Sequence, residues 1–249
     1  MKSVIKKTVV AAVLILGNSI YVYSQVNLSK YELGLSAGVF VYQGDLTPEK
    51  LGAYKTMKPQ LALHIYRKIS PSFSMRLNIN RGSLYGNDAK YANPGWRQQR
   101  NFIFTSSVTE LSVQGVWNIL ENKSPRFSPY VFAGGGLSFL NIKRSAANFN
   151  TAYFGENSAV ASGLAEDLAH PLPRVIPVVP VGAGVRYSLN ERFSLTAETS
   201  YRLSFTDYLD GFSKAANSNK NDHYLSHSVG VVYSFNKKTK GLGCPTVKL

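Results

Sequence analysis

The sequence predicts an all-β protein, an eight-stranded antiparallel up-and-down transmembrane β-barrel of the outer-membrane type. Three observations support this prediction. Apolar and polar residues alternate along eight short segments, as they do in strands with one apolar and one polar face. Short and long connections alternate between the segments, and a secretory signal precedes the first of them.

The first 24 residues have the pattern of a removed secretory signal. Three lysines precede an apolar run at residues 9–16, and small residues follow near the expected cleavage point. This run is far shorter than the roughly 20 residues that a membrane-spanning helix needs, which favours a signal over an anchor. We therefore expect a signal at 1–24, a barrel at 25–235 and a basic periplasmic tail at 236–249.

The chain is strongly basic, with a formal net charge of +14. Such a charge suits acidic lipid headgroups or an acidic partner, and it also favours plain solubility. Export takes the protein away from nucleic acid, so no nucleic-acid partner is expected. Cys244 is the only cysteine, which excludes a framework of internal disulfides.

Seven segments with clear strand character precede the last one. The fifth segment contains three consecutive glycines that obscure which residues share a face, and the eighth segment is 226–235. The first seven segments are 31–42, 60–66, 73–80, 110–119, 130–140, 178–189 and 193–205.

The connections predict the direction of the barrel in a membrane. Short turns follow the second, fourth and sixth segments, whereas the other gaps, 44–58, 84–107, 141–174 and 206–223, are long. Outer-membrane barrels place short turns in the periplasm and long loops outside. An even number of strands then puts both termini in the periplasm.

Charged residues on the polar faces help to separate a membrane barrel from a soluble barrel of the lipocalin type, which alternates in the same way. These faces carry three glutamates and three arginines but no lysine, whereas a solvated outer wall normally carries lysines. Glutamates in a narrow interior need guanidinium partners, and the apolar faces are uncharged over their centres. We therefore expect a lumen network of Glu32, Arg76, Glu110, Arg186, Glu198 and Arg202.

The last segment resembles the closing-strand signal of Gram-negative outer-membrane proteins. The matching positions are Ser228, Gly230, Tyr233 and Phe235. This resemblance implies recognition by the barrel-assembly machinery through strand pairing. The signal normally ends the chain, so the residues after Phe235 are a departure from it.

Most of residues 30–245 resembles the PorG-like family of small Bacteroidota outer-membrane barrels, components of the type IX secretion system. The resemblance rests on YELGLSAGVFVYQGDL, SVTELSVQGVWNIL, FSPYVFAGGG and IPVVPVGAGVRYSLNERFSLTAETSYRLSFTDYLDGFS, and on KKTKGLGCP near the end. The second and third loops contribute little to it. The resemblance implies a structural, non-enzymatic role beside a periplasmic secretion machine, with no cofactor.

The tail after Phe235 is then a candidate periplasmic contact. Lys237, Lys238 and Lys240 could bind an acidic partner or lipid headgroups, and Cys244 could form a mixed disulfide or pack as a small apolar residue. The alternative is a frayed, solvated end.

Eight-stranded outer-membrane barrels include lipid A acyltransferases and deacylases, so catalysis has to be tested. Alternation places His227 on the opposite face from its serine neighbours, which prevents a dyad with either. His64 faces the polar interior without a serine and a carboxylate beside it. His170 and His223 lie near loop acids but fit no metal-ligand spacing. We expect no catalysis and no metal.

Three aspartates near the starts of the long loops have two possible roles. Asp45, Asp207 and Asp210 could bind a cation or a partner, although acids beside glycine more often shape turns.

The alternative functions are a surface-binding or adhesin role, or a narrow channel. An adhesin would use the aromatic second loop, with Tyr85, Tyr91, Trp96, Phe102 and Phe104. Eight strands leave an interior that side chains can fill, which argues against a channel.

Overall fold

Eight strands form a closed antiparallel barrel in the computed structural model, which describes residues 28–120, 126–216 and 221–235. Each strand pairs with its neighbour in the sequence, and β8 closes the barrel against β1. The prediction of an eight-stranded up-and-down barrel is therefore confirmed. The strands are β1 (Tyr31–Gln43), β2 (Lys58–Lys68), β3 (Phe73–Asn87), β4 (Ile103–Asn118), β5 (Phe127–Ser145), β6 (Val175–Ser188), β7 (Phe193–Ser204) and β8 (His223–Ser234).

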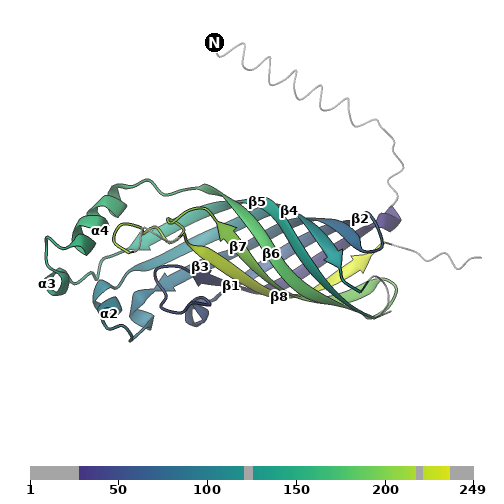
Figure 1. Ribbon diagram of the computed structural model, residues 1–249, viewed down its shortest axis with the longest axis horizontal. Coiled ribbons are helices and arrows are strands. Elements are labelled where there is room, and N and C mark those ends of the chain that lie inside the picture. The colour runs from purple at the N-terminus through teal and green to yellow at the C-terminus, as the bar shows by residue number, and fades with distance from the viewer. Residues whose placement is uncertain (1–27, 121–125, 217–220, 236–249) are drawn as a thin grey trace, which may run out of the picture.

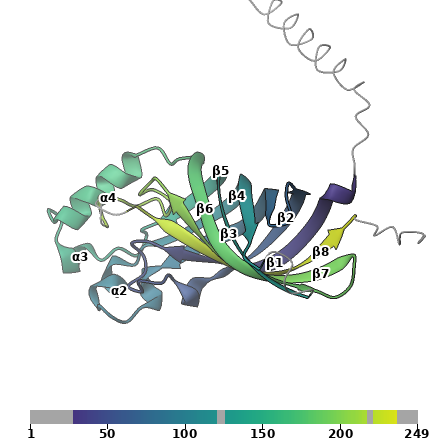
Figure 2. The ribbon, with the colours of Figure 1, turned by 45° about the vertical axis from the view of Figure 1, so that its right-hand side comes forward.

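The two ends of the barrel differ in their connections. One end, here called the turn end, carries the short turns, the start of β1 and the end of β8 (Figure 1). The other, the loop end, carries all the α-helices of the described residues, and a second view agrees (Figure 2). Its loops are the first (44–57), second (88–102), third (146–174) and fourth (205–222). They contain η3 (Tyr54–Thr56), η4 (Asp88–Lys90), α2 (Trp96–Arg100), α3 (Thr151–Phe154) and α4 (Ala159–Ala169), while η2 (Leu28–Lys30) precedes β1.

β3, β4 and β5 run furthest past their predicted segments toward the loop end. β3 continues to Asn87, β4 begins at Ile103, and β5 continues to Ser145. These ends pair with one another, as Asn87 with Ile103 and Ile103 with Ser145. The expectation of loops at 84–87, 103–107 and 141–145 is wrong. Backbone hydrogen bonding between the strands continues over these residues, although the apolar–polar alternation from which strands were predicted has ended.

The alternation in sequence matches an alternation in burial. Along β4, Leu111 and Val113 are exposed on the outside, whereas Glu110, Ser112 and Gln114 are buried inside. The same pattern identifies the faces of β5 that its glycines hide in the sequence. Tyr130, Phe132 and Ser138 are buried, and Val131, Leu137 and Phe139 are exposed.

The third loop contains α4, the longest helix among the described residues, which no pattern in the sequence predicted. α4 begins after Ser158, whose side chain accepts a hydrogen bond from the Ala161 backbone N–H. A serine in this position satisfies one of the free amides of the first turn. Among the described residues, no helix is long and apolar enough to cross a membrane.

Candidate functional site

The outer wall of the barrel is apolar and exposed. Leu35, Leu61 and Val229 are 63%, 66% and 67% exposed, although such residues are normally buried in soluble proteins. Large aromatic side chains ring the turn end of this wall. They are Phe73, Trp117, Phe127, Tyr187, Phe193 and Phe235, all exposed. An apolar band with an aromatic border is the surface that a lipid bilayer solvates.

Three ion pairs cross the lumen between strands that are not neighbours in the sheet. Arg76 on β3 contacts Glu198 on β7 at 2.5 Å. Arg186 on β6 contacts Glu32 on β1 at 2.7 Å, and Arg202 on β7 contacts Glu110 on β4 at 3.0 Å. The structure therefore brings together all six charged residues that the sequence places on the polar faces.

Arg76 is the centre of the middle layer of the lumen. Its Nε donates to Gln114 Oε1 at 2.8 Å and its Nη1 donates to Tyr66 Oη at 3.1 Å. Tyr130 Oη donates to the same Glu198 oxygen that Arg76 contacts, at 2.6 Å. Charge-assisted hydrogen bonds of this kind offset the cost of burying both charges.

Glu110 organises a second layer, nearer the loop end. It accepts hydrogen bonds from Arg202 Nε at 3.0 Å, Ser112 Oγ at 3.0 Å and Tyr224 Oη at 3.2 Å. Tyr224 also contacts Ser138 Oγ at 2.8 Å. The sequence did not indicate Tyr224 because the last predicted segment begins at Ser226, whereas β8 begins at His223.

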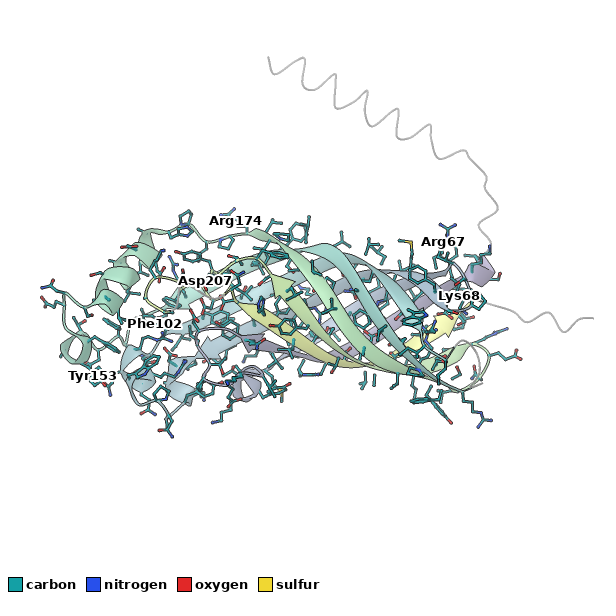
Figure 3. All side chains as sticks on the ribbon, viewed as in Figure 1. Arg67, Lys68, Phe102, Tyr153, Arg174 and Asp207 are labelled. Atoms are coloured by element: carbon teal, nitrogen blue, oxygen red, sulfur yellow. The ribbon has the colours of Figure 1, made fainter. Side chains whose placement is uncertain are left out.

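Glu32 forms the third layer, at the turn end. Besides Arg186 it contacts Lys68 Nζ at 2.8 Å and accepts from Ser234 Oγ at 2.5 Å. Figure 3 shows Lys68 at this end of the barrel, beside Arg67. Lys68 was not among the predicted lumen residues because β2 continues two residues past the predicted segment 60–66.

At the level of Arg76 the lumen has little empty space, whereas a pocket of about 540 Å³ opens at the turn end beside Glu32 and Arg186. A cavity of about 10 Å³ lies between Ser36, His64, Arg76 and their neighbours. A single ordered water needs about 10 to 15 Å³, so a hydrated ion does not fit at this level. This geometry argues against the narrow-channel alternative.

An aromatic cluster fills the barrel at the loop end. Phe102 and Phe212 stack with ring centroids 4.3 Å apart, and Tyr42 meets Phe104 edge-on at 4.7 Å. Phe102, Phe104 and Tyr91 are buried in this cluster. They therefore do not form the exposed aromatic surface that the adhesin alternative expects of the second loop, although Trp96 remains partly exposed.

A buried carboxylate holds the second loop together. Asp88 accepts hydrogen bonds from Arg100 Nε at 2.6 Å, Arg97 Nη1 at 2.9 Å and the Phe102 backbone N–H at 3.3 Å. Both arginines also donate to the backbone oxygen of Asp45, at 2.9 and 3.1 Å. This cluster ties the second loop to the first, and no spacing in the sequence indicated it.

Two separate sets of contacts to aspartates hold the fourth loop in place. Asp167 of α4 accepts from the backbone amides of Ser213, Lys214 and Ala215 at 3.1, 3.0 and 2.9 Å. Tyr42 Oη lies 2.6 Å from Asp210 Oδ2 and 2.9 Å from Asp222 Oδ1.

Burial shifts the proton affinity of the acids in the fourth loop. It raises the pKa of both Asp210 and Asp222 well above the usual range, and it raises the pKa of Asp207 to about 6. Asp210 Oδ1 also accepts from the Phe212 backbone N–H at 2.8 Å, so Asp210 shapes the turn as well. Figure 3 places Asp207 at the loop end, on the fourth loop.

The histidines do not assemble a hydrolytic site with serine and carboxylate. His64 faces the lumen and contacts Ser36 Oγ at 2.9 Å. His227 lies on the outer wall, where its ring nitrogens contact Thr199 Oγ1 at 2.6 Å and Tyr54 Oη at 2.9 Å. His170 stacks on Tyr208 with centroids 4.1 Å apart. Across the described ranges, no group of three or more potential metal ligands was found.

The closing strand has its aromatic residues at the turn end. Tyr233 packs against Phe193 at 5.2 Å and Phe235 at 5.0 Å between ring centroids. Ser228 and Gly230 pair with Gly38 and Ser36 of β1, along the seam where the barrel closes. The predicted signal at 1–24 and the tail residues Lys237, Lys238, Lys240 and Cys244 lie outside the described residues.

Comparison with known proteins identifies the family. A family model described as a domain of unknown function, DUF6089, matches residues 7–240. The chain belongs to the DUF6089 family. No protein of curated function is similar to it in sequence.

Solved structures share the barrel architecture of this DUF6089 protein at low sequence identity. Neisserial surface protein A is 14% identical with a TM-score of 0.48, over 83% of this chain and 97% of that one. Ail of Yersinia pestis is 10% identical with a TM-score of 0.45, over 82% and 96%. The outer membrane protein OprG of Pseudomonas aeruginosa is 10% identical with a TM-score of 0.40, over 83% and 96%. The likeness concerns the fold alone.

Proposed function

We propose that this DUF6089 barrel resides in the outer membrane as a non-enzymatic structural component of the type IX secretion system. The observation that carries the membrane assignment is the reversed polarity of the barrel. Its apolar residues face outward, while its glutamates and arginines pair inside. In water this arrangement exposes a large apolar surface, whereas in a bilayer it is the expected one.

The filled lumen supports a structural role rather than transport. Three ion pairs connect opposite walls, and at mid-barrel the remaining cavity is about 10 Å³. Such cross-links make the barrel a rigid platform on which other proteins can be held.

The secretion assignment rests on resemblance to the PorG-like family, most specifically TDYLDGFS at 206–213 and GLGCP at 241–245. In the proposed orientation the turn end and both termini face the periplasm. Partners would be outer-membrane lipid, the barrel-assembly machinery acting on the closing strand, and a periplasmic secretion protein at the basic tail. Lys237, Lys238, Lys240 and Cys244 would make that last contact.

The experiment that tests the secretion role separates the tail from the loops. One variant lacks residues 236–249, and a matched variant replaces the exposed loop residue Tyr153 with alanine. We expect both variants to fractionate with the outer membrane, and only the tail deletion to abolish export of type IX cargo. A crosslinker placed on Cys244 should capture a periplasmic protein.

Two outcomes would contradict the proposal. Normal cargo export without the tail, in cells that hold normal amounts of the barrel, would remove the anchoring role. Recovery of the mature protein in the soluble fraction without detergent would remove the membrane assignment as well.

A surface-binding role, the alternative, is favoured by one specific observation, the cavity of about 840 Å³ at the loop end, between the first, second and fourth loops.

A further inference from the structure

A groove of about 1100 Å³ runs along the outer wall of the barrel, lined by residues of β1, β2 and β3 and of β6, β7 and β8. Its outward-facing side chains are aliphatic, among them Ala37, Leu61 and Ala197, with two exceptions. Tyr187, in the aromatic ring of the turn end, lies at one end of the groove, and Arg81 lies at the other. An otherwise apolar surface therefore ends in a cation.

Arg81 lies near the edge of the apolar band that faces the loop end. At a rise of about 3.3 Å per residue and a tilt of about 40°, it is about 20 Å along the barrel axis from Phe73 in the aromatic ring. The apolar band of such barrels is about 25 Å tall. Beyond Arg81 the outward side chains become polar, because the next row across β3, β4 and β5 is Ser83, Ser107 and Asn141. Arg81 is thus at the depth of lipid headgroups.

The Arg81 guanidinium is oriented by a neighbouring strand and remains exposed. Its Nη1 donates to Thr109 Oγ1 on β4 at 2.8 Å, and the side chain is open to the groove. This single bond leaves most of the N–H donors of the guanidinium for a ligand. Their planar, fork-like arrangement matches two oxygens of one phosphate group.

The charge on the outer wall is of one sign. Among the described strand residues, no acid faces outward, because the glutamates of the strands pair with arginines in the lumen. The charged residues at outward-facing positions of the strands are Arg67, Arg81 and Lys143. An anion that approaches Arg81 along the wall therefore meets no carboxylate of the strands.

The groove and the cation together restrict the kind of occupant. In a bilayer, acyl chains cover the whole wall, so an apolar groove alone has no hydrophobic preference for one lipid over another. A preference requires the charge at its end. The molecule that matches both features is an amphiphile with an acyl chain and an anionic headgroup.

We propose that the groove binds a phosphate-bearing lipid of the leaflet at the loop end. The phosphate oxygens accept from the Arg81 guanidinium, and one acyl chain lies along the groove against the small side chains of Ala37 and Ala197. The proposal rests on the membrane residence in the proposed function and is independent of the secretion role.

The test uses the full mature chain in detergent micelles and measures bound lipid by native mass spectrometry. Phosphatidylglycerol and lipid A supply phosphate and acyl chains, and they distinguish a glycerophospholipid from a phosphorylated glycolipid. Diacylglycerol supplies chains without phosphate, and glycerol phosphate supplies phosphate without chains. We expect at least one of the two phosphate-bearing lipids to bind each barrel as a single molecule, more tightly than diacylglycerol and glycerol phosphate.

One matched pair of variants tests the headgroup contact. Arg81→Gln removes the charge at the end of the groove and should weaken binding about tenfold, equivalent to about 1.4 kcal/mol. Arg67→Gln removes the outward-facing arginine of β2, which is outside the groove, and should leave binding unchanged.

A second matched pair tests the acyl-chain contact. Ala197→Leu fills part of the groove with a larger apolar side chain and should weaken binding several-fold. Ala133→Leu adds the same side chain at an exposed, outward-facing position of β5 outside the groove and should leave binding unchanged. Heat-modifiable migration in gel electrophoresis confirms that each variant barrel is folded.

Four results would overturn the proposal. Neither phosphate-bearing lipid binds, or diacylglycerol or glycerol phosphate binds as tightly as they do. Arg67→Gln weakens binding as much as Arg81→Gln, which would indicate a general attraction of anions to a basic protein. Ala197→Leu and Ala133→Leu bind equally, which would place the acyl chain elsewhere. None of these results changes cargo export in the tail deletion or fractionation with the outer membrane, so failure here is distinguishable from failure of the proposed function.

Discussion

Arg76 and Glu198 face each other across the lumen, with Arg76 Nη1 donating to Glu198 Oε1 at 2.5 Å. They belong to β3 and β7, which are not neighbours in the sheet, and 122 residues separate them in the chain. The contact therefore joins opposite walls directly. Because both side chains are buried, each charge depends on the other for its compensation.

Removing one member of this pair should destabilise the barrel strongly. Arg76→Met leaves the Glu198 carboxylate buried without its guanidinium, which costs about 3 to 5 kcal/mol. The loss is measured as the free energy of unfolding in urea, in micelles. The double variant Arg76→Met with Glu198→Leu should recover part of that loss, because no unpaired charge remains. Glu156→Gln, at an exposed position of the third loop, is the control. A double variant with a lower free energy of unfolding than Arg76→Met would refute the argument.

The alternation in sequence predicted which residues enter the lumen but not how they pair. Glu32, Glu110 and Arg202 stand at inward positions by period two, which local chain geometry fixes. Their partners depend on the tilt and stagger of strands around the closed barrel. Glu110 thus meets Arg202 over 92 residues of chain, a relationship that no local pattern contains.

The loop end was less predictable for a related reason. Asp88, Arg97 and Arg100 come together because the second loop folds back over the barrel mouth, and loops have no repeating period. In the sequence Phe102 and Phe104 resemble exposed loop aromatics, yet they are buried and fill the barrel at the loop end. The side chains that close the end of a barrel are as aromatic as those of an exposed binding surface. Composition alone therefore could not distinguish a buried aromatic cluster from an exposed one.

The adjacent glycines of β5 should differ sharply in tolerance. A Cβ at Gly134, on the inward face, would lie against the Val113 carbonyl oxygen and 2.7 Å from Gln114 Cα, whereas one at Gly135 meets nothing within 4 Å. Gly134→Ala should therefore lose much of the heat-modifiable folded form, and Gly135→Ala should retain it. Equal folding yields for the two variants would show that β4 and β5 can separate without cost.

The first loop should depend on a contact with the outer wall. His227 contacts Tyr54 Oη at 2.9 Å and Thr199 Oγ1 at 2.6 Å, and its ring stacks on Tyr54 at 5.7 Å. His227→Ala removes these contacts and should lower the local stability of η3 by about 1 kcal/mol. Hydrogen exchange at the Thr56 and Met57 amides should then accelerate several-fold. His170→Ala, which breaks a stacking contact on the third and fourth loops, should leave both amides unchanged.

The fourth loop should loosen as pH rises. Tyr42 has one hydroxyl proton to share between Asp210 and Asp222, and burial raises the pKa of both acids well above normal. Asp45 and Arg100 also face this pair.

The sign of the pH effect follows from the raised pKa values of Asp210 and Asp222. Above pH 4 or so the unfolded acids release protons that the folded acids retain, so stability falls as pH rises toward the folded pKa. Amide exchange at Leu209 and Phe212, corrected for its intrinsic rate, should be slower at pH 5 than at pH 8. Asp222→Asn removes one of the two titrating carboxyls and should weaken this dependence, whereas Glu156→Gln should not. Protection that increases with pH in the wild-type chain would show that the two carboxyls are ionised in the folded loop.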